Sequence, residues 1–210
     1  MGIFNYDGPL VGFLERVGDI VFLNLIFLIC CIPVFTIGAA ITALSTITQK
    51  MVRKEEGYII RGFFKAFKEN FRQATLIWLI ILFAGIILLT DFYVLSRQGG
   101  SALFLAVLCL VFVAGIIALF EFVFVFPLLA RFDNTIRNTM KNALLLSVRY
   151  LPWTVLLTVI MLVPFIVGCL YLHIGIPFYM FGGFSLISLL SSRIFRRLFD
   201  PLEQNTATNG

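Results

Sequence analysis

Four long stretches of this chain contain no Asp, Glu, Lys or Arg, and they constrain the fold more than any other feature. These stretches are Ile20–Gln49, Gln73–Thr90, Gln98–Phe120 and Tyr150–Ser192. A helix that crosses a membrane needs about 20 mostly apolar residues, because the hydrocarbon layer is about 30 Å thick and a helix rises about 1.5 Å per residue. The longest stretch, of 43 residues, is therefore long enough for two crossings. His173, Gly175 and Pro177 interrupt it near the middle and predict a turn there.

The composition supports the same interpretation. Apolar residues make up 60% of the 210 residues, charged residues only 13%, and the mean hydropathy is +1.03. Soluble domains have about 45–50% apolar and about 25% charged residues, so an ordinary soluble enzyme, a disordered chain and a disulfide scaffold are excluded. We expect an all-α integral membrane helical bundle in the lipid bilayer, with one membrane domain over residues 1–200 and a flexible polar tail over 201–210. The five expected transmembrane helices cover residues 20–49, 73–95, 100–130, 150–172 and 176–193.

The distribution of Lys and Arg between the connections predicts the orientation of the chain in the membrane. The 50–72 connection carries seven basic residues and the 131–149 connection carries four, whereas the opposite side has only Arg16 and Arg97. With five crossings, both connections and the C-terminus lie on the cytoplasmic side of the membrane, and the N-terminus lies outside. Because this topology accounts for the net charge of +5, we expect no nucleic-acid partner.

Both basic connections have the pattern of amphipathic helices. In residues 57–72, phenylalanines recur at spacings of three and four while the basic residues occupy the other flank, and residues 132–149 repeat this less regularly. We expect two cytoplasmic amphipathic helices. Each either rests in the headgroup boundary of the bilayer or docks against a partner protein, and the sequence leaves both alternatives open. The docking candidates are Phe63, Phe64, Phe67, Lys68, Phe71, Arg72, Arg131, Asn134, Asn138 and Lys141.

A shift of the chain against itself by about 77 residues brings the two halves into correspondence. Each half contains a span, a basic amphipathic helix and another span, which is compatible with a parallel internal repeat about an axis along the membrane normal. Duplicated membrane folds include transporters and non-transporting scaffolds, so the repeat does not assign a function. The identical pairs are Gly38 with Gly115, Ala66 with Ala143, and Arg72 with Arg149.

Residues that carry catalysis are scarce. The chain has one histidine and no phosphate-binding glycine loop, and its four cysteines lie in apolar stretches without metal-ligand spacing. We therefore expect no enzyme activity, no metal and no cofactor. A carboxylate inside a span is costly, so Glu121 either marks function or holds two helices together through a hydrogen bond. The intramembrane polar candidates, which either line a substrate path or assist packing, are Asn24, Thr36 and Glu121.

Short motifs from about residue 10 to residue 200 carry a resemblance to a known family. The motifs are Asn24-Leu25, Pro33, Thr36-Ile37-Gly38-Ala39, Ala43-Leu44, RKEEG at 53–57, Phe63-Phe64, Phe67-Lys68, Asn70-Phe71, Gln73-Ala74, PLLARF at 127–132, Asn134, Asn138, Lys141-Asn142-Ala143 and Pro152. In their order and spacing they resemble the YesL family of bacterial membrane proteins. The resemblance implies a protein of the bacterial plasma membrane, of largely unknown function, that is encoded beside carbohydrate ABC importers, solute-binding lipoproteins and glycoside hydrolases.

From this context we expect a non-catalytic accessory membrane subunit of an oligosaccharide ABC importer. It would contact the permease or the ATPase through its cytoplasmic amphipathic helices, and a sugar is a possible ligand. Two alternatives remain open. One is a small stand-alone transporter or channel, with Glu121 and the kinked first span lining the path. The other is a membrane sensor that regulates sugar-utilisation genes.

Overall fold

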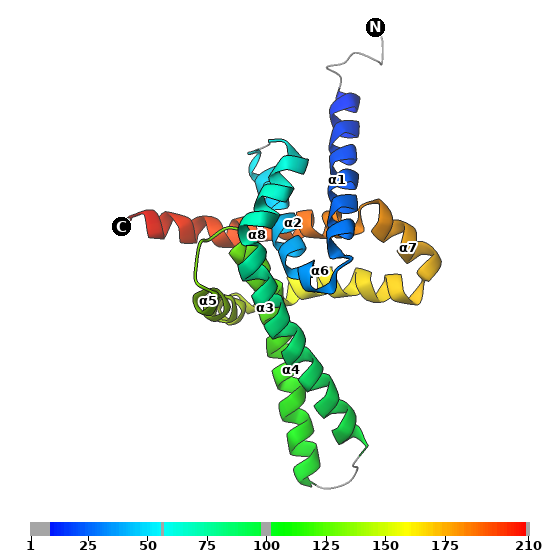
Figure 1. Cartoon of the computed structure of the whole chain (residues 1–210). Coiled ribbons are helices and arrows are strands. Elements are labelled where there is room, and N and C mark those ends of the chain that lie inside the picture. Colours follow the sequence, from blue (N-terminus) through cyan, green and yellow to red (C-terminus); the bar gives the residue numbers. More distant parts are fainter. Residues whose placement is uncertain (1–8, 56, 98–101, 209–210) are drawn as a thin grey trace.

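The computed structural model describes residues 9–55, 57–97 and 102–208, and the described part consists of α-helices and one short 3₁₀ helix. The all-α class predicted from the sequence is confirmed. In Figure 1, α3 and α4 form a long hairpin that projects away from the other helices. The elements are α1 Pro9–Cys31, η1 Val34–Thr36, α2 Ile37–Arg53, α3 Ile59–Ser96, α4 Ala102–Leu129, α5 Ile136–Arg149, α6 Leu151–Leu170, α7 Leu172–Phe181 and α8 Gly183–Thr208.

Helices α1 and α2 form a hairpin inside the segment predicted as the first span. Phe27 of α1 belongs to the same buried cluster as Ala43 and Ile47 of α2, so α2 returns along α1. The break lies at Pro33, which has no backbone N–H to donate and disfavours helical backbone in the residue before it. Residues 20–49, predicted as one span that Pro33 and Gly38 kink, are therefore divided between two helices that run back along each other.

Helix α3 is continuous over 38 residues, about 57 Å at 1.5 Å per residue. It combines the predicted amphipathic helix and the predicted second span, so the first of these is not a separate helix. A Cβ atom built on Gly38 would lie 2.5 Å from the Ala74 carbonyl oxygen, and one built on Gly62 would lie 2.9 Å from Cδ1 of Ile47. These contacts show that α2 and α3 run antiparallel, with the amphipathic part of α3 covering the C-terminal half of α2.

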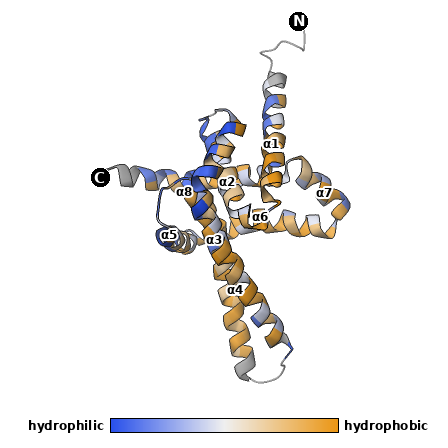
Figure 2. Ribbon diagram, viewed as in Figure 1, coloured by the Kyte–Doolittle hydropathy of each residue, from blue (hydrophilic) through white to orange (hydrophobic). Residues whose placement is uncertain are grey.

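Within the described part of the chain, three helices are long and apolar enough to cross a membrane: Ile59–Val94, Leu105–Leu129 and Leu151–Leu170. The bent pair α7 and α8 makes a fourth if it counts as one span. Figure 2 shows hydrophobic residues along most of the α3–α4 hairpin and along α6 and α7, whereas hydrophilic residues gather where α3 begins and on α5. These helices support a multi-pass membrane protein, and the predicted count of five is not confirmed.

The C-terminal third of the chain differs from the sequence-based prediction in where its helices break. Helix α5 is a separate amphipathic helix, as predicted, and α6 follows after one residue. The predicted turn at residues 173–177 is wrong, because this segment lies inside α7 and the breaks fall at Tyr171 and Gly182. Gly182 has a φ of 156°, which glycine adopts more readily than other residues, and α7 and α8 bend by 69° there.

The structure also bears on three further predictions. The predicted span 176–193 is divided between α7 and α8. Residues 201–208, predicted as part of a flexible tail, continue α8 as a helix, while residues 209–210 lie outside the described part. The internal repeat is not confirmed, because its first copy begins with the α1–α2 hairpin and its second with the single helix α4.

The largest buried cluster lies where the C-terminal half of α4 meets α8. Phe124 of α4 and Phe195 of α8 pack edge to face, with ring centroids 5.4 Å apart, and Phe195 stacks on Phe199 at 5.3 Å. All three side chains are almost completely buried. Aromatic pairs of this kind add to the stabilisation that comes from burial alone. The pair of Phe124 and Phe195 fixes α8 against the C-terminal half of α4. The residues of the buried ion pair described below come shortly after these two side chains in the sequence.

Candidate functional site

The phenylalanine stripe predicted for docking packs largely inside the chain. Phe63 is fully buried in the cluster formed by α1 and α2, and its ring stacks on that of Phe67 with centroids 6.3 Å apart. Phe71 continues the stripe, 5.4 Å from Phe67. The stripe therefore holds the first half of α3 on α2. Its periodicity is visible in the sequence, but an amphipathic pattern does not distinguish lipid, a partner protein and another helix of the same chain.

The opposite flank of α3 is exposed and charged. Lys65 and Glu69 form a loose ion pair at 3.9 Å, and Phe64 remains half exposed beside them. The first turns of α5 present a similar surface. We refer to these side chains together as the outer face; they are Phe64, Lys65, Lys68, Glu69 and Arg72 of α3 and Arg137, Asn138 and Lys141 of α5.

A hydrogen bond links α3, which carries the first part of the outer face, to the segment just before α5, which carries the second part. The Gln73 side-chain amide of α3 donates to the backbone carbonyl of Asn134 at 2.5 Å, immediately before α5. Thr135 then caps α5 by accepting from the N–H of Asn138 at 3.4 Å. Asn134 is thus held in position by the hydrogen bond to its backbone carbonyl. The side chains of Asn138 and Lys141 remain exposed. Both basic connections consequently lie at the same end of the molecule.

Arg131, the remaining docking candidate, forms a buried ion pair within the chain. Its side chain is 2% exposed and lies beyond the end of α4. The guanidinium donates to both carboxylate oxygens of Glu203, at 2.9 and 2.6 Å, and to Asp200 at 2.5 Å. Both acidic residues belong to α8, which the sequence-based prediction treated as a span and a tail. Arg131 therefore links α4 to α8 in this structure and presents almost no surface to a partner.

Polar side chains also connect α2 with α4 and α8, which the sequence did not predict. The Thr48 hydroxyl lies 2.9 Å from the hydroxyls of both Ser188 and Ser192. The Gln49 amide donates to the carbonyl of Pro127 at 3.0 Å. Helices in membranes commonly associate through small hydroxyl residues and hydrogen bonds of this kind. The spacing of Ser and Thr in both helices is a sequence signal for such a contact, but it does not identify which helices pair.

Two of the intramembrane candidates stabilise helix breaks. The Asn24 side-chain amide donates to the carbonyls of Tyr179 and Met180 at 2.8 and 3.1 Å, and its oxygen accepts from the Ser185 N–H at 3.2 Å. Asn24 thus bridges the break between α7 and α8. The Thr36 hydroxyl lies 2.6 Å from the carbonyl oxygens of Cys30 and Pro33, and so satisfies backbone groups at the end of α1.

Glu121 is half-buried in α4. No hydrogen bond or ion pair joins its carboxylate to another described residue, so the described part of the chain does not support the alternative in which Glu121 holds two helices together. Groups of three or more His, Cys, Asp or Glu residues that could hold a metal ion are likewise absent from this part.

Comparisons with known proteins show what this chain is similar to. Residues 20–92 match the family model described as "Protein of unknown function, DUF624". We refer to this matching segment as the DUF624 region. Over 202 residues the chain is 26% identical to the uncharacterized protein YteU of Bacillus subtilis (strain 168), a match that covers 94% of this chain and 88% of that protein. YesL-type membrane proteins fit the same family, so the resemblance seen in the sequence is confirmed. No solved structure matches the chain.

The DUF624 region comprises most of the α1–α2 hairpin and nearly all of the apolar part of α3. It therefore includes the phenylalanine stripe and the contact of Gly38 with Ala74. The ion pairs of Arg131 and the whole of α5 lie outside it, although the match to YteU extends over most of the chain. The part of the outer face on α3 consequently belongs to the DUF624 region, and the part on α5 does not.

Proposed function

We propose that this chain is a non-catalytic accessory membrane subunit that associates with an oligosaccharide ABC importer. The outer face is the observation that carries the proposal. Its eight side chains are all exposed, and they come from two helices that a hydrogen bond holds together. The inner phenylalanines fix α3 on α2, so the outer face is presented on a rigid support. A surface of this kind suits a partner that offers acidic and polar groups.

The kind of partner follows from the resemblance to the YesL family, whose members are encoded beside such importers. Helices predicted on the cytoplasmic side would reach the cytoplasmic loops of the permease or the ATPase. In this proposal the protein carries out no chemistry. It positions or stabilises the importer through the outer face, while its apolar helices hold it in the bilayer.

Co-purification tests the proposal. The tagged chain is expressed with its neighbouring importer genes in a bacterial host, extracted in a mild detergent and analysed for permease and ATPase subunits. We expect both subunits with the wild type and a loss of most of them with the charge reversal Lys68→Glu/Lys141→Glu. The matched control Arg193→Glu/Arg197→Glu changes two exposed arginines of α8 and should retain them.

Two outcomes would contradict the proposal. One is the absence of importer subunits from the wild-type preparation. The other is their equal loss from both charge-reversal variants, since this would indicate a general effect of charge. Sugar flux into proteoliposomes that contain this chain alone would favour a stand-alone transporter instead.

A further inference from the structure

A pocket of about 270 Å³ lies between the C-terminal end of α2 and the N-terminal end of α3. This volume is close to the lower end of the range for small-molecule sites, about 300 Å³. Its apolar part is formed by Ile47, Met51 and Ile59. Its basic side chains are Lys50 of α2 and Arg61 and Lys65 of α3. The pocket is therefore an apolar hollow lined by cations from two helices.

Among the described residues, the cations that line this pocket outnumber the carboxylates. Glu55 is the acidic side chain of the lining, and its carboxylate lies 3.4 Å from the guanidinium of Arg53. Lys65 lies 3.9 Å from Glu69, but both side chains are well exposed, and ion pairs of this kind contribute little. Lys50 forms no ion pair with any described residue. An anion in the pocket would thus meet an excess of cations.

The backbone adds to this positive potential. Helix α3 begins at Ile59, which lines the pocket, and the first N–H groups of a helix have no partner within it. The N-terminus of a long helix also carries a partial positive charge that favours anions. At the end of α2, the N–H groups of Lys54 and Glu55 donate to the carbonyl oxygens of Met51 and Lys50, so these carbonyls are partly satisfied within the chain.

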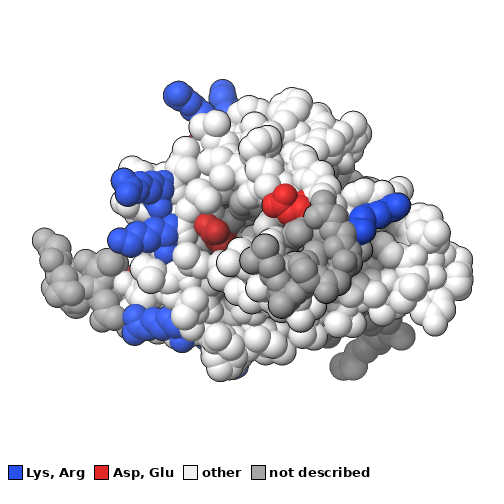
Figure 3. Space-filling view, turned by 90° about the horizontal axis from the view of Figure 1, so that it is seen from below, with Lys and Arg blue, Asp and Glu red and all other residues white. Residues whose placement is uncertain are grey.

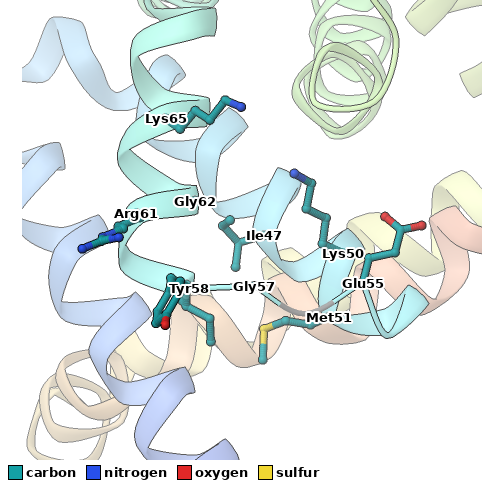
Figure 4. Close-up of a pocket in the computed structure, with 10 residues that line it drawn as sticks. Ile47, Lys50, Met51, Glu55, Gly57, Tyr58, Arg61, Gly62 and Lys65 are labelled. Carbon is teal, nitrogen blue, oxygen red and sulfur yellow. The ribbon is translucent and has the colours of Figure 1, made fainter.

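The directions of the side chains distinguish the three cations. In Figure 4, Lys50 and Lys65 extend on the same side of the helix pair, from α2 and α3 respectively, whereas Arg61 points away from both. The guanidinium of Arg61 instead lies over the ring of Tyr58, 5.3 Å from its centroid. Lys50 and Lys65 are therefore the side chains that could close on one small anion, and Arg61 supplies a longer-range charge.

We infer that the α2–α3 pocket binds a phosphate group through Lys50 and Lys65, with the N-terminus of α3 and Arg61 adding positive charge at longer range. The apolar lining fits the carbon skeleton that carries the phosphate. Two sources share this chemistry: the headgroup of an anionic phospholipid in the adjacent leaflet, and a soluble phosphate compound. Lys65 belongs to both the pocket and the outer face, whereas Lys50 belongs to the pocket alone, so phosphate binding does not require docking to an importer.

Binding measurements on the full chain in a neutral detergent test the inference. The probes are dioctanoyl phosphatidylglycerol and inorganic phosphate, each titrated at low ionic strength. The variant Lys50→Gln/Lys65→Gln changes two exposed side chains, so it should fold like the wild type. We expect it to weaken binding about 10- to 30-fold. The matched control Arg193→Gln/Arg197→Gln removes the same charge from α8 and should stay within about 2-fold of the wild type.

Each outcome of these titrations either supports or overturns the inferred phosphate site. Pocket-dependent binding of inorganic phosphate supports the site and identifies a soluble phosphate compound as its source. Pocket-dependent binding of the lipid alone supports the site and identifies the headgroup. Equal weakening in the two double variants would show that the anion responds only to overall charge, and this would overturn the inference. Absence of binding for both probes with the wild type would also overturn it.

Discussion

Both ends of the Asn24 side-chain amide form hydrogen bonds across the break between α7 and α8. The side chain is fully buried, its two amide hydrogens serve carbonyls at the end of α7, and its oxygen serves an N–H at the start of α8. Each of these backbone groups would otherwise lack a partner, because the helix that should supply one is interrupted at Gly182. A single residue of α1 thus stabilises a break more than 150 positions away in the sequence.

The substitution Asn24→Leu should lower the free energy of unfolding by at least about 2 kcal/mol, since each buried polar group left unpaired costs about 1–3 kcal/mol. Thermal unfolding followed by circular dichroism in one detergent measures the loss. The matched control is Asn70→Leu on α3, because the Asn70 amide donates only to the Ala66 carbonyl four residues earlier in its own helix. Equal losses in the two variants would contradict the role assigned to Asn24.

The ion pairs of Arg131 predict an asymmetry between their two sides. The guanidinium is 2% exposed, whereas Asp200 and Glu203 are about 40% exposed. Removal of the acids by Asp200→Ala/Glu203→Ala leaves a buried charge without a counter-charge and should cost about 3 kcal/mol or more. Arg131→Gln leaves two carboxylates that water can reach and should cost about 1 kcal/mol. Unfolding midpoints in the same detergent measure both, and a larger loss for Arg131→Gln would contradict this account.

At the scale of helices, the contact between α2 and α3 depends on the missing side chain of Gly38. A Cβ there would lie 2.5 Å from both the Ala74 oxygen and Cβ of Trp78, so Gly38→Ala forces the helices apart and should cost about 1–3 kcal/mol. The control Gly115→Ala adds a methyl group where nothing lies within 4 Å, and should be neutral or slightly stabilising. Unfolding midpoints compare the two. Equal destabilisation would mean that the close contact is not maintained.

The same two glycines show what could be predicted from the sequence. The alignment of the halves paired Gly38 with Gly115, yet one lies in a tight helix contact and the other in open space. Runs without charge predicted the helical class and the positions of α4 and α6, because transfer into lipid depends on composition. The uncharged runs did not predict the hairpin break at Pro33 or the bend at Gly182. A proline or glycine in an apolar run is compatible with a kink, a turn or an intact helix, and the neighbouring helices decide among these.

The candidate site was predictable to a similar extent. The periodicity of Phe63, Phe67 and Phe71 predicted a helix with one apolar face, but the helix that covers this face is set by tertiary packing. In the sequence, Arg131 has the pattern of an exposed basic residue in a connection between spans. Only the fold brings it to Asp200 and Glu203, about 70 positions away. The outer face, in contrast, contains four of the predicted docking residues besides Phe64, and for these the docking role remains a prediction.

For the whole molecule, most of the basic residues lie away from the apolar α3–α4 hairpin. Seen from the side toward which the α3–α4 hairpin points, most of the surface is uncharged, and Lys and Arg lie toward the periphery (Figure 3). The bond of Gln73 to Asn134 and the ion pair of Arg131 with Glu203 bring both basic connections and the end of α8 together. A bilayer that encloses the hairpin would leave all of these on one side.

The hairpin of α1 and α2 predicts that the start of α1 lies on that same side, because α2 returns along α1 toward the basic connections. Single cysteines at Arg16, Lys68, Asn138 and Arg97, in a variant without the four natural cysteines, test this with a membrane-impermeant maleimide. We expect Arg97→Cys to react in intact cells and the other three only after permeabilisation. Reaction of Arg16→Cys in intact cells would instead mean that α1 crosses the membrane, as the sequence alone predicted, and that the hairpin opens in the bilayer.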